Sequence, residues 1–275
     1  MTKLFTAGAD PEYFLENEGK YLAAPPFVTG TKTDPMSLPH GGYVMYDNVA
    51  IEFGIVPAKT EDEFVSNILN TVEDVRAILP EDVTLACVPS AHFDADQLIH
   101  PECCEFGCQP DFNAWTGKTN IIPDGAAEST FRSCGGHIHI GWEFIAKHPQ
   151  LFIKWMDYIN GMISVSLDNN DAAKARRKLY GKAGCYRPTS YGAEYRTLSN
   201  FWVKNESHIR LQYSLVDDLC GALDYGKIVL PDLEPEIVQR VINEGDDKFA
   251  RQIVKGYLWD IFSTHTKDLL KEVNY

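Results

Sequence analysis

Two short segments of this chain carry residues that can do chemistry at regular spacing. In the first, His137 and His139 alternate with apolar residues after two glycines, and in the second Glu194 and Arg196 flank a tyrosine. Because successive side chains of a β-strand point to opposite faces, each pair shares one face if its segment is a strand. Histidine and carboxylate are metal ligands, and arginine is suited to a forked contact with phosphate. The combination indicates a site for a metal ion and a phosphate group.

Three further carboxylates fit such a site. Asp10 and Glu12 lie two residues apart, so in an extended segment both can face one or two hard cations. Glu52 interrupts an apolar segment, with Ala50 and Gly54 beside it on its own face, and an unpaired buried charge there is costly unless a cation satisfies it. Structural explanations stay open for every motif: a solvated acidic turn for the first pair, hydrogen-bonded sheet histidines, and a plain ion pair between the glutamate and the arginine.

A basic segment lies between the two motifs that open this section. Six cationic residues gather there against an acidic background: Lys174, Arg176, Arg177, Lys178, Lys182 and Arg187. They can supply a local anion-binding pocket, or they can solvate the end of a helix, which is the usual role of a run of charges.

The elements that must position these residues are predicted from periodicity and turn signals. Two strands flank the turn at residues 17–19, and a hairpin over residues 43–56 turns near residues 47–48. Thr60 and Glu63 form a capping box for a helix that ends at Pro80. We predict a strand over 83–88, a long functional loop over 89–132, and helices over 149–167, 205–223 and 234–273. Strands and helices do not alternate as in a βαβ repeat, so an antiparallel sheet with helices on one side is expected.

Bulk composition limits the class of protein. The chain has 275 residues, 44% of them hydrophobic, and can bury its own core. A net charge of −14 argues against general nucleic-acid or anionic-membrane binding. We see no signal peptide and no apolar run of the roughly 20 residues that span a bilayer, so a cytosolic protein with reduced cysteines is expected. Cys103, Cys104 and Cys108, near His100, are an alternative zinc site, although their spacing matches no paired pattern.

The order of the motifs resembles that of the phage-encoded COOH-NH2 ligases, also called amidoligases, and the related fold of glutamine synthetase and glutamate-cysteine ligase. Four segments carry the resemblance: Gly8–Glu12, Val49–Phe53, Gly135–Gly141 and Tyr191–Arg196. It covers about residues 3–203, within a single catalytic domain over 1–275 whose residues 204–275 add C-terminal helices.

The resemblance implies an α+β fold in which a curved antiparallel sheet forms a funnel of the glutamine synthetase catalytic-domain type, with helices packed on its outer side. ATP would enter at one end and the acceptor carboxylate at the other. The implied ligands of Mg²⁺ or Mn²⁺ are Asp10, Glu12, Glu52, His137 and Glu194, with Asp47 a candidate for the third carboxylate that the family places near Glu52. The candidate nucleotide-binding residues are His139, Arg176, Arg177, Arg187 and Arg196. The candidate catalytic residues are Glu52, Arg187 and Arg196.

The activity implied is ATP-dependent ligation of a carboxylate to an amine through an acyl phosphate, on small-molecule or peptide substrates, in the host cytoplasm if the protein is phage-encoded. The apolar C-terminal helices fit either the core or the interface of a homo-oligomer. Two alternatives stay open. His137, His139 and Glu143 also match the His-x-His-x3-Glu pattern of cupins, which would make the protein a metal-dependent dioxygenase or isomerase. A catalytically inactive binding protein with the amidoligase fold is the other.

Overall fold

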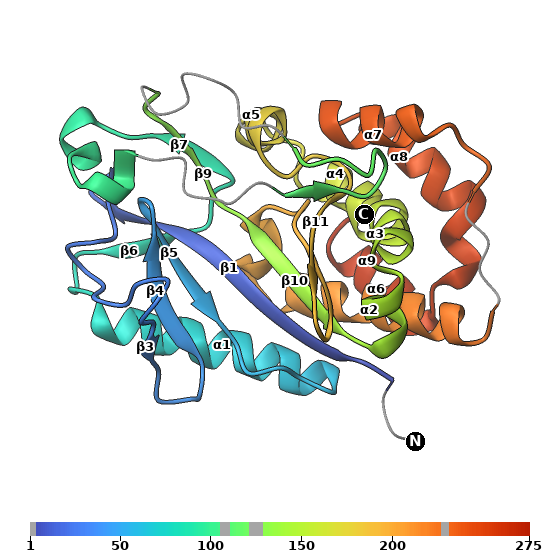
Figure 1. Cartoon of the computed structure of the whole chain (residues 1–275), viewed down its shortest axis with the longest axis horizontal. Coiled ribbons are helices and arrows are strands. Elements are labelled where there is room, and N and C mark those ends of the chain that lie inside the picture. The colour runs from blue at the N-terminus through green and yellow to red at the C-terminus, as the bar shows by residue number, and fades with distance from the viewer. Residues whose placement is uncertain (1–3, 105–110, 121–128, 227–230) are drawn as a thin grey trace.

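A large antiparallel sheet forms the centre of the computed structural model, which describes residues 4–104, 111–120, 129–226 and 231–275. Ten strands of the described residues belong to this sheet, and its main path runs β3-β4-β5-β1-β10-β12-β11-β8, with β2 and β6 also paired to β1 (Figure 1). Their bounds are β1 (Thr6–Asn17), β2 (Lys20–Leu22), β3 (Met36–Ser37), β4 (Tyr43–Asp47), β5 (Ala50–Gly54), β6 (Thr84–Ala86), β8 (Phe112–Asn113), β10 (Gly136–Gly141), β11 (Cys185–Thr189) and β12 (Gly192–Tyr195). The long strand β1 therefore lies between the β4–β5 hairpin and β10.

The two predicted hairpins of the N-terminal part are confirmed. The turn between β1 and β2 places Glu18 at φ 47° and Gly19 at φ 80°, and the turn between β4 and β5 places Asn48 at φ 58°. Positive φ at the turn residues matches the right-handed twist of the flanking strands, and Asn and Gly adopt it at little cost.

The first helix, α1 (Glu61–Ile78), begins where the capping signal predicts. Thr60 Oγ1 accepts a hydrogen bond from Glu63 N at 3.2 Å, while Glu63 Oε2 accepts from Lys59 N at 2.8 Å, one residue before the usual partner of a capping box. The helix ends ahead of Pro80 and buries the apolar side chains of Phe64, Ile68, Val72 and Val75.

Helices cover one face of the sheet. That face carries the buried apolar side chains of Ala7, Ala9, Ile138, Ile140 and Tyr195, which share one core with the buried residues of the helices. The remaining helices are α2 (Glu143–Lys147), α3 (Pro149–Met156), α4 (Met162–Leu167), α5 (Asp171–Leu179), α6 (Glu206–Asp224), α7 (Pro235–Glu244), α8 (Asp247–Ile253) and α9 (Thr264–Glu272). The described part of the chain contains no helix with the length and apolar character needed to cross a bilayer.

The bounds of the helix expected over 149–167 are confirmed, since α3, the π-helical turn Asp157–Gly161 and α4 follow one another from Pro149 to Leu167. The helix expected over 234–273 is broken into α7, α8 and α9. Gly245 at φ 73° ends α7 and the Asp246 side chain caps α8, so local capping stops the longer helix. The strand expected to carry both Glu194 and Arg196 ends at Tyr195, and a 3₁₀ turn, Asn200–Lys204, follows further along the chain.

The long segment over 89–132 contains short elements in the residues that the structure describes. Strands β7 (Ser90–His92) and β9 (Phe131–Ser133) pair as a separate two-stranded sheet, and Ala95–Leu98 and Pro101–Cys104 form 3₁₀ turns. This small sheet leads directly into β10.

Candidate functional site

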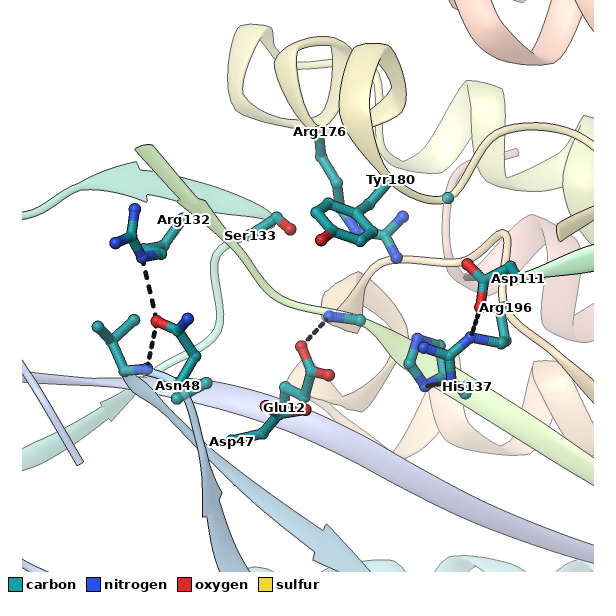
Figure 2. A pocket seen from close by; sticks show the side chains of 14 residues that line it. Glu12, Asp47, Asn48, Asp111, Arg132, Ser133, His137, Arg176, Tyr180 and Arg196 are labelled. Atoms are coloured by element: carbon teal, nitrogen blue, oxygen red, sulfur yellow. Dashed lines mark hydrogen bonds and ion pairs between the residues drawn. The ribbon is translucent and has the colours of Figure 1, made fainter. Parts of the chain in front are cut away.

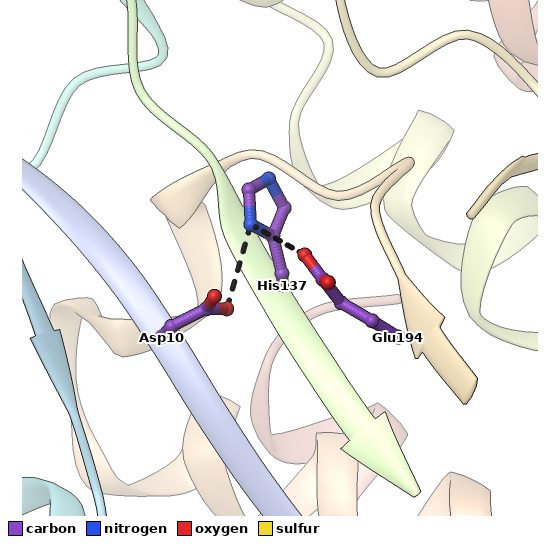
Figure 3. A group of neighbouring side chains, drawn as sticks. All are labelled: Asp10, His137 and Glu194. Carbon is purple, nitrogen blue, oxygen red and sulfur yellow. Dashed lines mark ion pairs between the residues drawn. The ribbon is translucent and has the colours of Figure 1, made fainter. Parts of the chain in front are cut away.

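Asp10, His137 and Glu194 meet on the sheet face opposite the apolar core, and we call them the histidine cluster (Figure 3). They come from β1, β10 and β12, and the antiparallel register places Asp10 directly opposite His137. His137 Nδ1 lies 3.4 Å from Asp10 Oδ1 and 3.5 Å from Glu194 Oε1, and no side chain of the three is more than 13% exposed. Three predicted ligands, far apart in sequence, therefore converge.

Asp10 also contacts His139, whose Nε2 lies 3.1 Å from Asp10 Oδ1. Burial opposes ionisation of Asp10, but the nearby charges of His139 and His137 outweigh it and hold the pKa of Asp10 well below its usual range. Burial likewise disfavours the charged form of His139, while Asp10 raises the pKa of His139 above its usual value. Asp10 is thus an anion flanked by two imidazoles.

A second group, which we call the carboxylate cluster, consists of Glu12, Asp47 and Glu52. Glu12 on β1 lies directly opposite Glu52 on β5, and Asp47 comes from the end of the hairpin strand β4. One oxygen of each carboxylate lies within 4.8 Å of the others. Gly135 N donates to Glu12 Oε2 at 2.6 Å, and Lys32 Nζ lies 2.7 Å from Asp47 Oδ1.

Burial of these carboxylates makes their shared charge costly. Burial is the largest cause that raises the pKa of Glu12, and for Glu52 burial together with Asp10, Glu12 and Asp47 raises the pKa well above its usual range. The Asp47 Oδ1 and Asp10 Oδ1 atoms are buried, and their neighbours are nitrogens of Lys32 and His139 respectively. Buried carboxylates gathered in this way fit hard divalent cations, with one imidazole tolerated among the oxygen donors.

Two predicted arginines lie beside the histidine cluster. The Arg196 guanidinium is buried and forms an ion pair with Glu194. Its Nε atom lies 2.6 Å from Asp111 Oδ1, and its Nη1 atom lies 3.3 Å from His137 Nδ1. Arg187, on β11 opposite Glu194, places Nη1 3.5 Å from Glu194 Oε2. The ion pair left open as an alternative is present, and Glu194 faces His137 at the same time.

One end of this row of polar residues is aromatic, and we call Tyr43, His139 and Tyr191 the aromatic end. The Tyr191 hydroxyl lies 3.1 Å from His139 Nδ1. Tyr43 packs over Gly54, where an added Cβ would lie 2.2 Å from the tyrosine ring. Tyr43 and Tyr191 are 37% and 52% exposed, so their rings are accessible to a ligand.

The other end opens into a cavity of about 50 Å³ (Figure 2). Its lining combines acids, cations and neutral polar groups with four small or apolar residues: Glu12, Asp47, Asn48, Asp111, Arg132, Ser133, His137, Arg176, Tyr180 and Arg196, together with Val49, Ala50, Gly135 and Gly181. One water needs roughly 10–15 Å³ of such space. The cavity therefore holds about three to five water-sized groups. We call it the acceptor-side cavity for its position at the carboxylate cluster.

The basic segment divides in the structure. On α5, Arg176 and Arg177 are both buried, so the explanation of a solvated helix end is wrong for these two residues. Arg176 lines the cavity, whereas Arg177 donates to the Asp168 carbonyl at 3.1 Å and lies 3.7 Å from Asp168 Oδ2, away from the cavity lining. The two arginines predicted together for nucleotide binding therefore lie in different environments.

Several cavity residues were missed from the sequence. Asp111, Asn48 and Arg132 reach the cavity from loops and from the short strand β9. Arg132 Nε donates to Asn48 Oδ1 at 3.0 Å, which joins the β4–β5 turn to the segment before the histidine strand. In the sequence, Asp111 follows a proline within the predicted functional loop. An acid at this position was the one signal that could have identified a cavity residue there.

The zinc and cupin patterns do not form sites among the described residues. Glu143 is the first residue of α2 and pairs at the surface with Lys147 Nζ at 2.6 Å, so it does not join the histidines. Cys103 and Cys104 instead donate to the backbone carbonyls of Asn48 and Leu98, and Cys108 lies outside the described residues.

A structural comparison supports the fold. The chain is similar to the bifunctional glutathione synthetase from Pasteurella multocida, with a TM-score of 0.54 and 10% sequence identity over 98% of this chain and 46% of that chain. It thus spans less than half of that protein, and the similarity concerns the fold alone. The comparison with curated proteins found no match.

A family model covers more than half of the sequence. The model described as phage phiEco32-like COOH.NH2 ligase-type 2 matches residues 122–273. The match includes His137, Glu194 and the C-terminal helices, while Asp10 and Glu12 come from the part of the chain before it. On this evidence the chain belongs to the phage phiEco32-like COOH.NH2 ligase-type 2 family.

Proposed function

We propose that this chain is an ATP-dependent carbon–nitrogen ligase that activates a carboxylate as an acyl phosphate and joins it to an amine. The observation that carries the proposal is the pair of clusters on one sheet face. Asp10 and Glu12 belong to different clusters and are two residues apart on β1, so the clusters are displaced by about 7 Å along the strand. That spacing suits the simultaneous binding of a phosphate chain and of the carboxylate that attacks it.

Magnesium or manganese would be held by the histidine cluster and by the carboxylate cluster. When bound, such cations neutralise phosphate charge and polarise the oxygens of the transferred group. The donor set supports this assignment because most of its ligands are the hard oxygens that Mg²⁺ prefers. The five ligands predicted from the sequence fall into the two clusters, and Asp47 completes the second.

We infer that the curved antiparallel sheet forms a funnel of the glutamine synthetase type, with one substrate at each end. We place the nucleotide at the aromatic end, where Tyr43 and Tyr191 offer exposed rings for a base and Arg187 lies beside Glu194. The carboxylate acceptor enters from the acceptor-side cavity, next to Glu12 and Asp47. Similarity in fold to a protein named as a bifunctional glutathione synthetase favours a synthetase reaction for this chain.

The reaction then follows in two balanced steps. A carboxylate oxygen of the acceptor attacks the γ-phosphorus of ATP, ADP leaves, and an acyl phosphate forms. Arg187 and Arg196 hold the phosphoryl oxygens and stabilise the charge that develops on them. The nitrogen of the amine next attacks the acyl carbon, phosphate leaves, and the nitrogen loses a proton. Burial and neighbouring carboxylates raise the pKa of Glu52 well above its usual range, which favours this residue as the acceptor of that proton.

Calorimetric titration of chelator-treated protein with ATP tests the proposal, with and without MgCl2 or MnCl2. We expect binding that requires the divalent cation, and its loss in Asp10→Asn, which keeps the shape of the ligand but removes its charge. Glu143→Gln is the matched control, since it removes an exposed carboxylate outside both clusters. ATP binding that is independent of metal, or equal in the two variants, would contradict the assignment.

The acyl phosphate is tested separately by chemical trapping. Hydroxylamine converts an acyl phosphate to a stable hydroxamate, so a panel of carboxylates is incubated with enzyme, ATP, Mg²⁺ and hydroxylamine. We expect hydroxamate and ADP in equal amounts with the correct acceptor, and a large loss of both in Arg187→Gln. ADP formation without hydroxamate would argue against the intermediate.

A further inference from the structure

Asp157 is a fully buried carboxylate that the proposed reaction does not use. It lies in the π-helical turn Asp157–Gly161, within the helices that cover the sheet. Its Oδ1 atom accepts hydrogen bonds from the Tyr195 hydroxyl at 2.7 Å and from Thr197 Oγ1 at 3.3 Å. Its Oδ2 atom accepts a hydrogen bond from Trp115 Nε1 at 2.5 Å. Because these side-chain donors are neutral and offset the burial of a carboxylate less well than a cation does, the segments that Asp157 holds are the better guide to its role.

The contact with Tyr195 reaches the site through the alternation of side chains along β12. Glu194 and Arg196 face the site, whereas Tyr195 between them points into the core that the sheet shares with the helices. The Arg196 backbone N donates to the Cys185 carbonyl at 2.9 Å, so the chain stays paired to β11 one residue beyond the end of β12. A hydrogen bond to Tyr195 therefore fixes the piece of backbone that carries both charged residues.

The π-helical turn leaves room for this contact. A Cβ at Gly161 would lie 2.8 Å from the Tyr195 hydroxyl oxygen and 3.5 Å from Asp157 Oδ1. The first of these contacts is too short for a real Cβ atom, so any larger residue would push the hydroxyl away from the carboxylate. Single π-helical turns inside a helix are frequent at functional sites, and this one brings a carboxylate against the back of a strand that carries site residues.

The contact with Trp115 reaches the same arginine from another segment. Trp115 belongs to residues 111–120, and Asp111 at the start of this segment places Oδ1 2.6 Å from Arg196 Nε (Figure 2). One carboxylate, that of Asp157, thus holds both segments that form the ion pair between Asp111 and Arg196.

We propose that Asp157 is a positioning residue that holds the Arg196 guanidinium where the transferred phosphoryl group is bound. It acts by fixing Tyr195 next to the arginine and Trp115 in the segment of Asp111, and it does not itself touch the substrate. A guanidinium that is already oriented stabilises developing phosphoryl charge without reorganising during the reaction. This inference rests on the proposed function and deepens it, because it assigns the support of one phosphate-binding residue.

Calorimetry with two nucleotide probes tests the role. ADP and AMP-PNP, an ATP analogue whose γ-phosphate is not transferred, are titrated into the full chain with MgCl2. The ratio of the two affinities reports the γ-phosphate contacts, which the proposed function gives to Arg187 and Arg196. We expect Asp157→Ala to lower the AMP-PNP affinity about 5- to 20-fold and to leave the ADP affinity within about twofold, since part of one charged hydrogen bond is lost. General damage to the fold would lower both affinities.

Three more variants separate the contacts. Tyr195→Phe and Trp115→Phe each remove one donor to Asp157 and keep an aromatic ring, so each should lower the AMP-PNP affinity less than Asp157→Ala does. Asp157→Asn keeps an acceptor and should restore part of the affinity. Tyr213→Phe is the matched control, because it removes a buried hydroxyl that donates to the Lys59 carbonyl at 2.8 Å, and it should leave both affinities unchanged.

A double-mutant cycle shows whether Asp157 acts through Arg196. In the Arg196→Gln background we expect Asp157→Ala to have no further effect on the AMP-PNP affinity, since the group that it positions is absent. An equal effect in both backgrounds overturns the inference, and so does a fall of both affinities together or of neither in Asp157→Ala. Circular dichroism and thermal melting verify folding, and Tyr195→Phe takes the place of Asp157→Ala if the latter does not fold.

The wild type separates this inference from the proposed function. Magnesium-dependent binding of AMP-PNP by the wild type, with the same affinities in the Asp157 variants, overturns the positioning role alone. A wild type that binds neither nucleotide, or binds both without magnesium, overturns the ligase function and with it the role of Asp157.

Discussion

Replacing Glu52 by glutamine is expected to stabilise the metal-free protein and to weaken its response to magnesium. Glu52 is buried, and its cluster brings three carboxylate oxygens within 4.8 Å of one another. Burial and the charges of Asp10, Glu12 and Asp47 raise the pKa of Glu52 well above its unfolded value of 4.5. The wild type therefore loses stability as pH rises from about 4.5 toward the folded pKa, and the glutamine variant does not.

The magnitude follows from the geometry of the cluster. One ionised neighbour at the 4.8 Å limit costs 332/(20 × 4.8), or about 3.5 kcal/mol, at an effective dielectric constant of about 20. This repulsion is absent if Glu52 stays protonated. For a carboxyl with an unfolded pKa of 4.5, staying protonated at pH 8 costs at most about 5 kcal/mol. We expect the metal-free variant to be more stable than the wild type by about 3 kcal/mol at pH 8 and by less than about 1 kcal/mol at pH 5.

Urea unfolding at both pH values, in chelator and in excess MgCl2, measures these differences. Magnesium should stabilise the wild type by mass action and stabilise the variant much less. The difference in unfolding free energy between the two proteins should therefore shrink or change sign at pH 8. The reasoning is refuted if the variant is the less stable protein in chelator at pH 8. An equal response of both proteins to magnesium would remove Glu52 from the metal site.

Three further substitutions probe groups around the site. Arg177→Gln leaves Asp168 without its buried partner and should cost about 3–5 kcal/mol in urea unfolding; a cost below 1 kcal/mol would show that the pair is dispensable. Burial raises the pKa of Asp157 from 3.8 to about 7, so the wild type should lose up to about 4 kcal/mol of stability relative to Asp157→Asn as pH rises between these values, and parallel pH profiles would contradict this. Gly181→Ala should lower stability by about 1–2 kcal/mol through positive-φ strain alone and displace the Arg176 side chain, and an unchanged melting temperature would show that the guanidinium moves without cost.

Local rules predicted the parts of the site that lie within one element. Alternation along β10 was sufficient to place His137 and His139 on one face, and alternation along β5 set Glu52 between Ala50 and Gly54. The turn at Asp47–Asn48 follows equally from short-range backbone preferences. These patterns are readable because the strand geometry repeats every two residues whatever the strand packs against.

Contacts across the sheet depended on the tertiary structure. Asp10 meets His137 and Glu12 meets Glu52 through the register of strands joined by long connections, and no short-range rule fixes that register. The same holds for Asp111, whose ion pair with Arg196 joins residues 85 positions apart in the sequence.

The sequence by itself determined the kinds of chemistry available to this protein: hard ligands, imidazoles and guanidiniums at strand spacing, in an order that resembles one family. Only the tertiary structure decided how two adjacent arginines differ. Arg176 and Arg177 are equivalent in charge and helical setting, yet one faces a cavity and the other faces Asp168. Neighbouring residues on a helix point about 100° apart, so what each one meets is fixed by the elements packed around the helix, which no local pattern encodes.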